Sequence, residues 1–447
     1  MHGGLVLRAD SHGKTGPFGM HVLALGSDGL VRRVWSATGG STALVRGINA
    51  VAALAATSLL ARLLSATDFG LFVLAQVAIN GLSLLAARGR DQLAVREMAV
   101  GGHQSTEITS NYLDWAARSV LRNGTFLAAV GVLIAGLTGQ ATPFVLLVIT
   151  TIPVLALTRF FRGVAQAMDR TAIGVFHELT TISLSLAVLG LAYLTLDAPL
   201  GLVPVHLTYL VAAAVSLLSL VSTLRAIPTV SGFAIANDAS VRWRRSGDAL
   251  ALTAVMFFGL AYLETFVLAQ IAGAVTVGAY AIANRLAVML SLAALPVAMV
   301  RGPRLARRIE AGDRSEARAE AHQILLVTTF VALPFVAVLG VFADSAVSLL
   351  GGAELSEFSD LGLVLRLLLP AQLFGSVAIA ASVCLTMYKR ESTVARATVF
   401  AVVLQLLAAV VFIGQFELIG AVISRIVGGC VLLVTLLRVL VKEIDAS

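Results

Sequence analysis

The stretch 60-LARLLSATDFGLFVLAQ-76 lies at the turn between two long apolar segments, and it has a counterpart 208 residues later, 268-LAQIAGAVTVGAYAIAN-284. Small and apolar residues recur at the same places in both: Leu60, Ala61, Ala66, Gly70 and Ala75 in the first, and Leu268, Ala269, Ala274, Gly278 and Ala283 in the second. Tyr280 stands where the first stretch has Phe72. Chance similarity between Ala/Leu-rich helices is the alternative, but the matched glycine and aromatic residue favour an internal repeat.

The composition indicates a membrane protein. Hydrophobic residues make up 58% of the 447 residues and charged residues 13%, whereas a soluble domain has about a quarter charged residues. This apolar excess predicts many membrane-spanning helices of about 20 residues each. The twelve apolar segments that we identify are 43–64, 69–88, 112–137, 142–160, 171–194, 202–224, 248–270, 276–299, 321–342, 361–384, 393–414 and 417–440.

The basic residues indicate how these segments are oriented. If the N-terminus is inside the cell, the segments predicted to face the cytoplasm all carry Lys or Arg, and the outside loops carry none. When basic residues at the cytoplasmic ends of spans are counted as cytoplasmic, the remaining seven lie within the predicted spans: Arg46, Arg62, Arg118, Arg122, Arg285, Arg366 and Arg425. Because cytoplasmic loops are enriched in Lys and Arg, we expect both termini in the cytoplasm. The net charge of +7 then marks these loops, and no nucleic-acid partner is expected.

The repeat divides the spans into two halves of six. Residues 41–226 are expected to form an N-lobe and residues 248–440 a C-lobe, joined by a cytoplasmic linker at 227–247. Residues 1–40 should be a mobile cytoplasmic tail without a signal peptide, and 441–447 a short C-terminal tail. Because six is even, the halves share one orientation. The prediction is an all-α polytopic membrane protein with a parallel pseudo-twofold repeat, which binds substrate between its lobes.

The repeated stretch should build the outer turn between the first two helices of each lobe. Asp68 is predicted to cap the second helix by accepting hydrogen bonds from its free N–H groups. Thr276 is predicted to cap the corresponding helix in the second copy. Gly70 and Gly278 would let backbones pack closely near the turn. Arg62, at the outer rim, is expected to be structural and to pair with Asp68.

Charged residues inside predicted spans mark function or paired structure. Asp114, Arg118 and Arg122 are spaced by four residues along the third span, on one stripe. Asp114 and Arg118 should form a local ion pair, and Arg122 should face protein or a water-filled cavity, because exposure to lipid would be costly. Arg46, near the inner end of the first span, either extends to the interface or lines a cavity.

Glu264 and Arg285 lie at similar depths in the seventh and eighth spans, so we expect them to meet. The pair is either a structural salt bridge or a switch, in which an anionic substrate competes for Arg285 and releases Glu264. Glu178, in the fifth span, is a second candidate for coupling or switching. A packing role is the alternative for Glu178 and the expected role of Arg366 and Arg425.

An apolar first helix, then 61-ARLLSATDFGLF-72, then a second helix ending in 88-RGRDQLAVREMA-99 resembles the polysaccharide transporter family. That family belongs to the superfamily of multidrug, oligosaccharidyl-lipid and polysaccharide exporters. The resemblance extends over residues 40–440 in length and layout. It implies two six-helix lobes around a cavity lined by helices 1, 2, 7 and 8. It also implies that the protein flips a polyprenyl-diphosphate-linked oligosaccharide to the outer leaflet by alternating access. The sequence departs from the family pattern in its long N-terminal tail and in having twelve rather than fourteen spans, and the number of spans disfavours the lipid II flippase branch.

A diphosphate-glycan headgroup cannot cross hydrocarbon, because its charges and hydroxyls would lose their water. Arginine and amide groups in a cavity would replace that water, and the guanidinium fork donates two parallel hydrogen bonds to phosphate. The predicted substrate-binding residues are Arg46, Asn49, Gln76, Asn80, Arg118, Arg122, Asn284 and Arg285. Expected partners are the lipid-linked glycan, membrane lipids and polysaccharide assembly proteins, in a bacterial cytoplasmic membrane.

Two other functions stay open. A multidrug or small-molecule antiporter of the same superfamily would need an acidic or aromatic cation site, but the only deep acids are Glu264 and Glu178. A membrane glycan polymerase or ligase would need a large outer loop, and the longest, about 343–360, has no convincing acid–base pair. We therefore expect a transporter rather than an enzyme. Cys384 and Cys430 form no cluster with His, so no metal or cofactor is expected.

Overall fold

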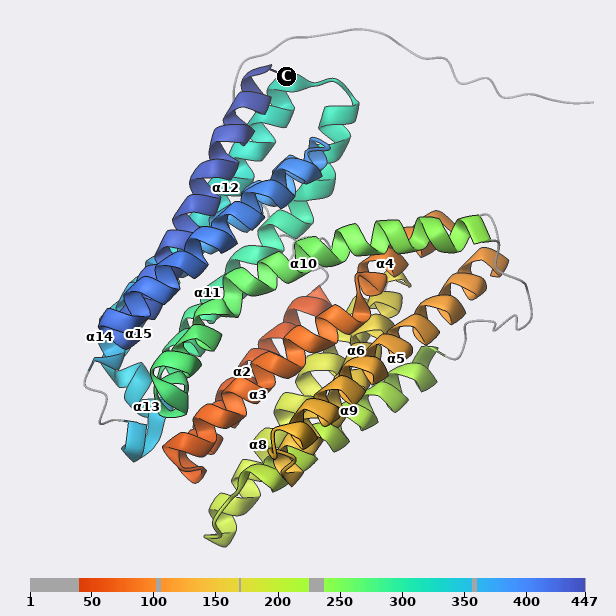
Figure 1. Ribbon diagram of the computed structural model, residues 1–447. Coiled ribbons are helices and arrows are strands. Elements are labelled where there is room, and N and C mark those ends of the chain that lie inside the picture. The colour runs from red at the N-terminus through yellow and green to blue at the C-terminus, as the bar shows by residue number, and fades with distance from the viewer. Residues whose placement is uncertain (1–39, 102–105, 169, 225–236, 356–359, 447) are drawn as a thin grey trace, which may run out of the picture. The chain divides into compact units, whose positions relative to one another are not determined.

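The computed structural model describes residues 40–101, 106–168, 170–224, 237–355 and 360–446. Within these ranges all regular elements are helices (Figure 1). They are α2 (Gly40–Leu63), α3 (Ala66–Ala87), α4 (Arg90–Gly101), α5 (Thr106–Leu137), α6 (Pro143–Ala167), α7 (Thr171–Val175), η1 (Phe176–Thr180), α8 (Thr181–Leu196), α9 (Leu202–Leu224), α10 (Asn237–Ile271), α11 (Gly273–Glu310), α12 (Arg314–Val341), α13 (Ala343–Leu355), α14 (Leu361–Met387) and α15 (Glu391–Ala446).

Eleven segments of the described chain are long and apolar enough to cross a membrane. The last, Glu391–Glu443, has 53 residues and would extend about 80 Å as one helix, far more than the ~30 Å hydrocarbon core. It breaks at Glu417, where φ is +47°, so α15 contains two spans. The chain is a multi-pass membrane protein, and the predicted fold with its twelve spans is confirmed.

Each half packs around one central helix. In the first half, α6 contacts α3, α4, α5 and α9; in the second, α14 contacts α11, α12, α13 and α15. Two short helices, α4 and α13, lie outside the spans. The fifth span is divided, because a π-helical turn, η1, separates α7 from α8. The boundaries of the lobes stay predictions, since residues 1–39 and 225–236 lie outside the described residues.

The two copies of the repeated stretch meet each other, because α3 packs against α11. A Cβ atom on Gly278 would lie 3.3 Å from the backbone nitrogen of Gly70 and 3.0 Å from a ring carbon of Phe69. A Cβ atom on Gly70 would collide with the carbonyl group of Ala274. Glycine is therefore required at Gly70 if the backbones are to approach this closely, whereas a Cβ atom on Gly278 would be tight and need a small shift of its neighbours. The contact joins the two halves near the repeated turns.

The turn itself differs from the prediction in three ways. Ser65, not Asp68, is the N-cap of α3: its hydroxyl accepts a hydrogen bond from the Asp68 backbone nitrogen at 3.1 Å. Asp68 lies in the first turn, where a negative charge still suits the helix dipole. Arg62 donates to the carbonyl oxygen of Leu349 at 2.6 Å instead of pairing with Asp68. Thr276 caps no helix, because its hydroxyl donates to the carbonyl one turn earlier.

The first residues of α10 pack against the N-terminal half of the chain. Arg88, which follows α3, forms an ion pair with Asp248 of α10 at 2.6 Å. The Arg90 side chain is only 2% exposed, and its guanidinium carbon lies 5.2 Å from the ring centre of Trp115. Trp243 of α10 contacts Trp115 at 5.4 Å between ring centres. This cluster of cation–π and aromatic contacts fixes the start of α10 on α4 and α5.

Candidate functional site: a polar cavity between helices

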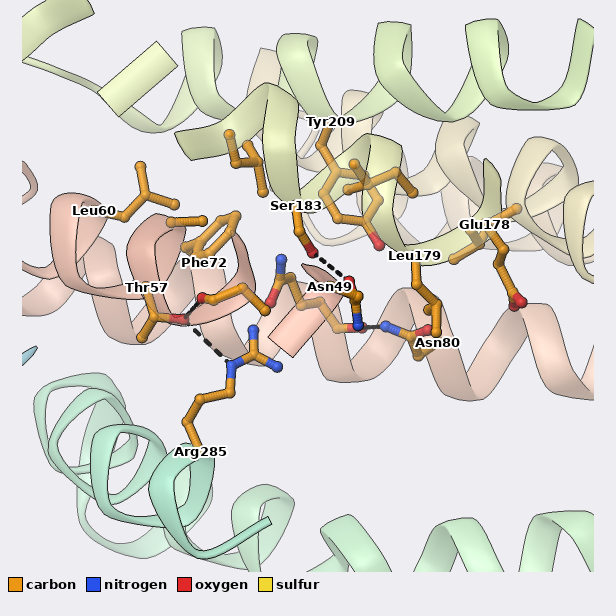
Figure 2. A pocket seen from close by; sticks show the side chains of 16 residues that line it. Asn49, Thr57, Leu60, Phe72, Asn80, Glu178, Leu179, Ser183, Tyr209 and Arg285 are labelled. Atoms are coloured by element: carbon orange, nitrogen blue, oxygen red, sulfur yellow. Dashed lines mark hydrogen bonds between the residues drawn. The ribbon is translucent and has the colours of Figure 1, made fainter. Parts of the chain in front are cut away.

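Two adjoining hollows, which we call together the central cavity, are lined by residues of α2, α3, α6, η1, α8, α9, α10 and α11. Their volumes, open mouths included, are about 670 and 740 Å³. Residues that line both are Thr57, Phe72, Gln76, Asn80 and Arg285. The first hollow also includes Asn49, Glu178, Ser183 and Tyr209 (Figure 2), and the second includes Tyr262, Thr265, Tyr280 and Asn284.

Arg285 is the cationic residue that lines both hollows. It is exposed, although Asn284 before it and Leu286 after it on α11 are buried, so its side chain extends into the cavity. Its Nε donates to the Thr57 hydroxyl of α2 at 3.2 Å (Figure 2). No carboxylate of the described residues lies within ion-pair distance of Arg285. The cavity therefore holds a positive charge that has no fixed counterion in the described chain.

Amide side chains supply the remaining polarity. Asn49 accepts a hydrogen bond from Ser183 at 3.1 Å, and Asn80 donates to the backbone oxygen of Gln76 at 2.8 Å (Figure 2). The Oδ1 atom of Asn284 is buried and has no hydrogen-bond partner among the described residues. Because an amide group both donates and accepts, these side chains suit a ligand that carries several hydroxyls.

Glu178 lines the first hollow from η1. Its side chain is 2% exposed and lies between two arginines of α6: Oε2 is 2.6 Å from Nη1 of Arg162, and Oε1 is 3.5 Å from Nε of Arg159. Arg159 also donates to the Asn80 backbone oxygen at 3.5 Å. The one acidic residue that lines the described cavity is thus neutralised by arginine.

Comparison with known proteins identifies a family of similar sequences and several solved structures with a similar fold. The sequence model of a family described as polysaccharide biosynthesis protein matches residues 37–308, more than half of the chain. The chain belongs to this family. The model of the MatE family matches residues 249–411. No curated protein sequence gives a significant match. The predicted resemblance to polysaccharide transporters is confirmed at the family level.

Several solved structures share the fold of this chain at low sequence identity. An inward-facing multidrug resistance MATE family transporter of the MOP superfamily has a TM-score of 0.75 at 16% identity, over 91% of this chain and 98% of that one. The lipid II flippase MurJ in an inward closed conformation has 0.71 at 13% identity, over 88% and 86%. A MOP superfamily transporter from Pyrococcus furiosus, described as having a binding pocket of reverse polarity, has 0.69 at 15%, over 93% and 96%.

Most of the predicted substrate-binding residues of this family member come together. Those that line the central cavity are Asn49, Gln76, Asn80, Asn284 and Arg285. Arg46 lies one turn before Asn49 on α2, is partly buried and interacts electrostatically with Arg162. Their role in binding stays a prediction.

Arg118 and Arg122 do not line the central cavity, and their predicted role in substrate binding stays a prediction. Arg118 forms the predicted ion pair with Asp114, but its side chain is 75% exposed, and Arg122 is exposed too. The reason is the rotation of α5: its core stripe carries Tyr112 and residues four and eight positions later. The arginine stripe is offset by two residues, about 200° around the helix, so it faces away from the core.

Glu264 pairs with Arg425 and not, as predicted, with Arg285. The Glu264 carboxylate is fully buried, and its Oε1 is 2.6 Å from Nη1 of Arg425. Tyr280 donates to it at 3.0 Å, and Gln405 donates to its other oxygen at 2.8 Å. Helix α10 turns Glu264 toward α15 rather than toward the cavity. The predicted partner, Arg285, was wrong because the prediction rested only on the depth of the residues in the membrane. Arg366, for which a packing role was expected, forms an exposed ion pair with Asp344 at 2.5 Å.

Sequence reasoning missed Arg159 and Arg162. Neither is among the predicted site residues, because the apolar run of the fourth predicted span ends at about residue 160, on its cytoplasmic side. The helix continues to Ala167, and the spacing of three residues places both guanidinium groups on one face. That spacing, inside 158-TRFFRGVAQA-167, was the signal that could have revealed them.

Proposed function

We propose that this chain is a transporter that flips a polyprenyl-diphosphate-linked oligosaccharide from the inner to the outer leaflet of a bacterial cytoplasmic membrane, with both termini in the cytoplasm. The observation that carries the proposal is Arg285, a cation in a polar cavity without a counterion among the described residues. A guanidinium group in such surroundings favours an anionic ligand, and phosphate fits its planar fork. Membership of the polysaccharide biosynthesis protein family supports a glycan as the cargo.

The lining of the cavity suits both parts of such a headgroup. Arg285 would bind the diphosphate, while Asn49, Asn80 and Asn284 would exchange hydrogen bonds with sugar hydroxyls in place of water. The lipid tail would stay in the bilayer. The cavity has walls from both halves of the repeat, α2 and α3 on one side and α11 on the other. Rocking of the lobes would therefore move the site from one leaflet to the other.

A multidrug antiporter is the second candidate. The match to the MatE family over residues 249–411 and the likeness to a multidrug resistance MATE transporter favour it. A cationic drug would need a free acid in the cavity, but Glu178 is held by Arg159 and Arg162. It would also approach Arg285, and like charges repel strongly at low dielectric. The charge of the cavity therefore favours the anionic substrate.

The proposal is tested by substitution of Arg285. In liposomes that contain a fluorescent polyprenyl-diphosphate oligosaccharide, we expect wild-type protein to transfer the lipid between leaflets and Arg285→Ala to do so about ten- to hundredfold more slowly. This range corresponds to the loss of a charge-assisted hydrogen bond worth about 1.5–3 kcal/mol. Leaflet exchange is measured by quenching of the fluorophore that remains outside.

Arg122→Ala is the matched control, because Arg122 is an exposed arginine that lies outside the cavity. It should leave the rate within about twofold of wild type, the scatter expected of surface substitutions of about 0.5 kcal/mol. Absence of transfer by wild-type protein, together with counter-transport of cationic dyes, would replace the proposal with the multidrug antiporter. Equal loss in both variants would show that Arg285 has no special role.

A further inference from the structure

The environment of Glu178 is built like an anion site. The carboxylate is 2% exposed, and two guanidinium groups, from Arg159 and Arg162 of α6, converge on it at 3.5 and 2.6 Å. Neither arginine lines the first hollow among its described residues, whereas Glu178 does. The carboxylate therefore stands between the cavity and the two arginines, where the anionic group of a ligand would have to be to bind them.

The charges around Glu178 do not cancel. Asp91 of α4 supplies Arg162 with a second acid at 3.8 Å, and Arg46 adds a third positive charge that interacts with Arg162. Three guanidinium groups thus accompany two carboxylates, and removal of Glu178 from the cluster would leave two positive charges in excess. A diphosphate group has the charge to replace it, and it can accept hydrogen bonds from both arginines at once.

The backbone at Glu178 also allows movement. Residues Phe176–Thr180 form a π-helical turn between two α-helical segments, and single π turns inside α-helices are frequent at functional sites. Conversion of this turn to α-helix would shift the register by one residue and rotate Glu178 by about 100° around the axis. That rotation would remove the carboxylate from Arg159 and Arg162 without unfolding the span.

We infer that Glu178 is a resident anion: it occupies, in the empty transporter, the arginine site that a phosphate group of the substrate occupies during transport. The inference rests on the proposed function for the identity of that anion, a diphosphate. Two arginines left unpaired inside the membrane would be costly, so the carboxylate stabilises the empty state. It also competes with the substrate and, by returning to the arginines, promotes release.

The test measures binding of two probes, inorganic pyrophosphate and farnesyl diphosphate, to full-length protein in nanodiscs of neutral phosphatidylcholine. We expect Glu178→Gln to bind at least one probe about tenfold more tightly than wild type by calorimetry, equivalent to about 1.4 kcal/mol, because the competing charge is gone. Glu178→Asp keeps the charge and should bind like wild type. Adding Arg162→Ala to Glu178→Gln should abolish the gain. Tightening for farnesyl diphosphate alone would identify a lipid-borne headgroup, and tightening for both would identify the diphosphate group itself.

Unchanged affinity of Glu178→Gln for both probes would overturn the inference, as would a gain that survives Arg162→Ala. If Glu178→Gln is unstable when empty, pyrophosphate should raise its thermal unfolding midpoint more than that of wild type. An equal rise in both proteins would contradict the inference. The two proposals fail separately. If the wild-type protein transfers the glycan lipid but Glu178→Gln has unchanged probe affinity, only the inference about Glu178 is wrong. If Glu178→Gln binds a probe more tightly but no glycan lipid is transferred, only the proposed cargo is wrong.

Discussion

Arg285 and Arg425 are both guanidinium groups inside the membrane, and they differ in their partners. Arg425 is enclosed: Glu264 lies at 2.6 Å, Gln372 accepts from it at 3.3 Å, and it also contacts the carbonyl of Ala261. Arg285 has a neutral partner, Thr57, and extends into the central cavity. The first arrangement ties α10, α14 and α15 together, whereas the second leaves a charge ready for a ligand. We therefore assign Glu264 a structural role.

Loss of the Glu264 charge should destabilise the protein rather than alter substrate recognition. Glu264→Gln leaves Arg425 buried without a counterion, which costs about 3 to 5 kcal/mol in comparable buried pairs. The thermal unfolding midpoint of the purified protein should fall accordingly. The double variant Glu264→Gln/Arg425→Gln should recover most of the loss, because no lone charge remains. A single variant as stable as wild type would show that the pair does not hold these helices together.

At the scale of elements, the contact between α3 and α11 joins the two copies of the repeat. Gly70 and Gly278 bring the backbones together, and Phe69 and Tyr280 beside them are almost fully buried. On the same side, Arg62 and Ser58 of α2 both donate to the Leu349 carbonyl of α13. These contacts close the lobes against each other at the ends that we predict to lie outside the cell, here called the outer ends.

A methyl group at Gly70 should open this closure. Gly70→Ala places a Cβ atom against the Ala274 carbonyl, whose backbone cannot move aside cheaply. After replacement of Cys384 and Cys430, spin labels would be attached at two exposed positions, Leu137 of α5 and Leu349 of α13. Double electron–electron resonance should then give a longer and broader distance distribution than in the protein without Gly70→Ala.

Gly47→Ala is the control for that experiment, because a Cβ atom there meets no other atom within 4 Å. Both substitutions favour the helix by about 1 kcal/mol of intrinsic propensity, so a difference between them isolates the collision at α11. The same distance distribution in Gly70→Ala as in Gly47→Ala would mean that the glycine contact does not hold the outer ends closed.

The elements themselves could largely be predicted from the sequence, because hydropathy determines which segments leave water. The break of α15 at Glu417 falls where two predicted spans, 393–414 and 417–440, are separated. The π turn at Phe176–Thr180 was not predicted, since neither apolar period nor composition distinguishes it from α-helix. Likewise Ser65 and Asp68 are both good capping residues, and only the backbone path decides between them.

At the scale of the whole molecule, the sequence predicted the two-lobed fold and most of the cavity lining, but not which charges pair. Hydropathy and helical rise give the depth of a residue in the membrane; they do not give the rotation of its helix. Glu264 therefore had two arginines at suitable depth, Arg285 and Arg425, and only the packing of α10 on α15 chooses between them. The same ambiguity about helix rotation led to the prediction that Arg122 faces the cavity.

The central claim is that arginine and amide groups in a chamber between the repeats replace the water of a diphosphate headgroup. It is tested most directly by a polyprenyl diphosphate with a photoreactive group on its head, cross-linked to the protein in liposomes and mapped by mass spectrometry. We predict labels on α2, α3 and α11, near Thr57, Asn80 and Asn284, that unlabelled polyprenyl diphosphate competes away. Labels confined to the exposed face of α5 around Arg118 and Arg122, with none in the central cavity, would contradict the account.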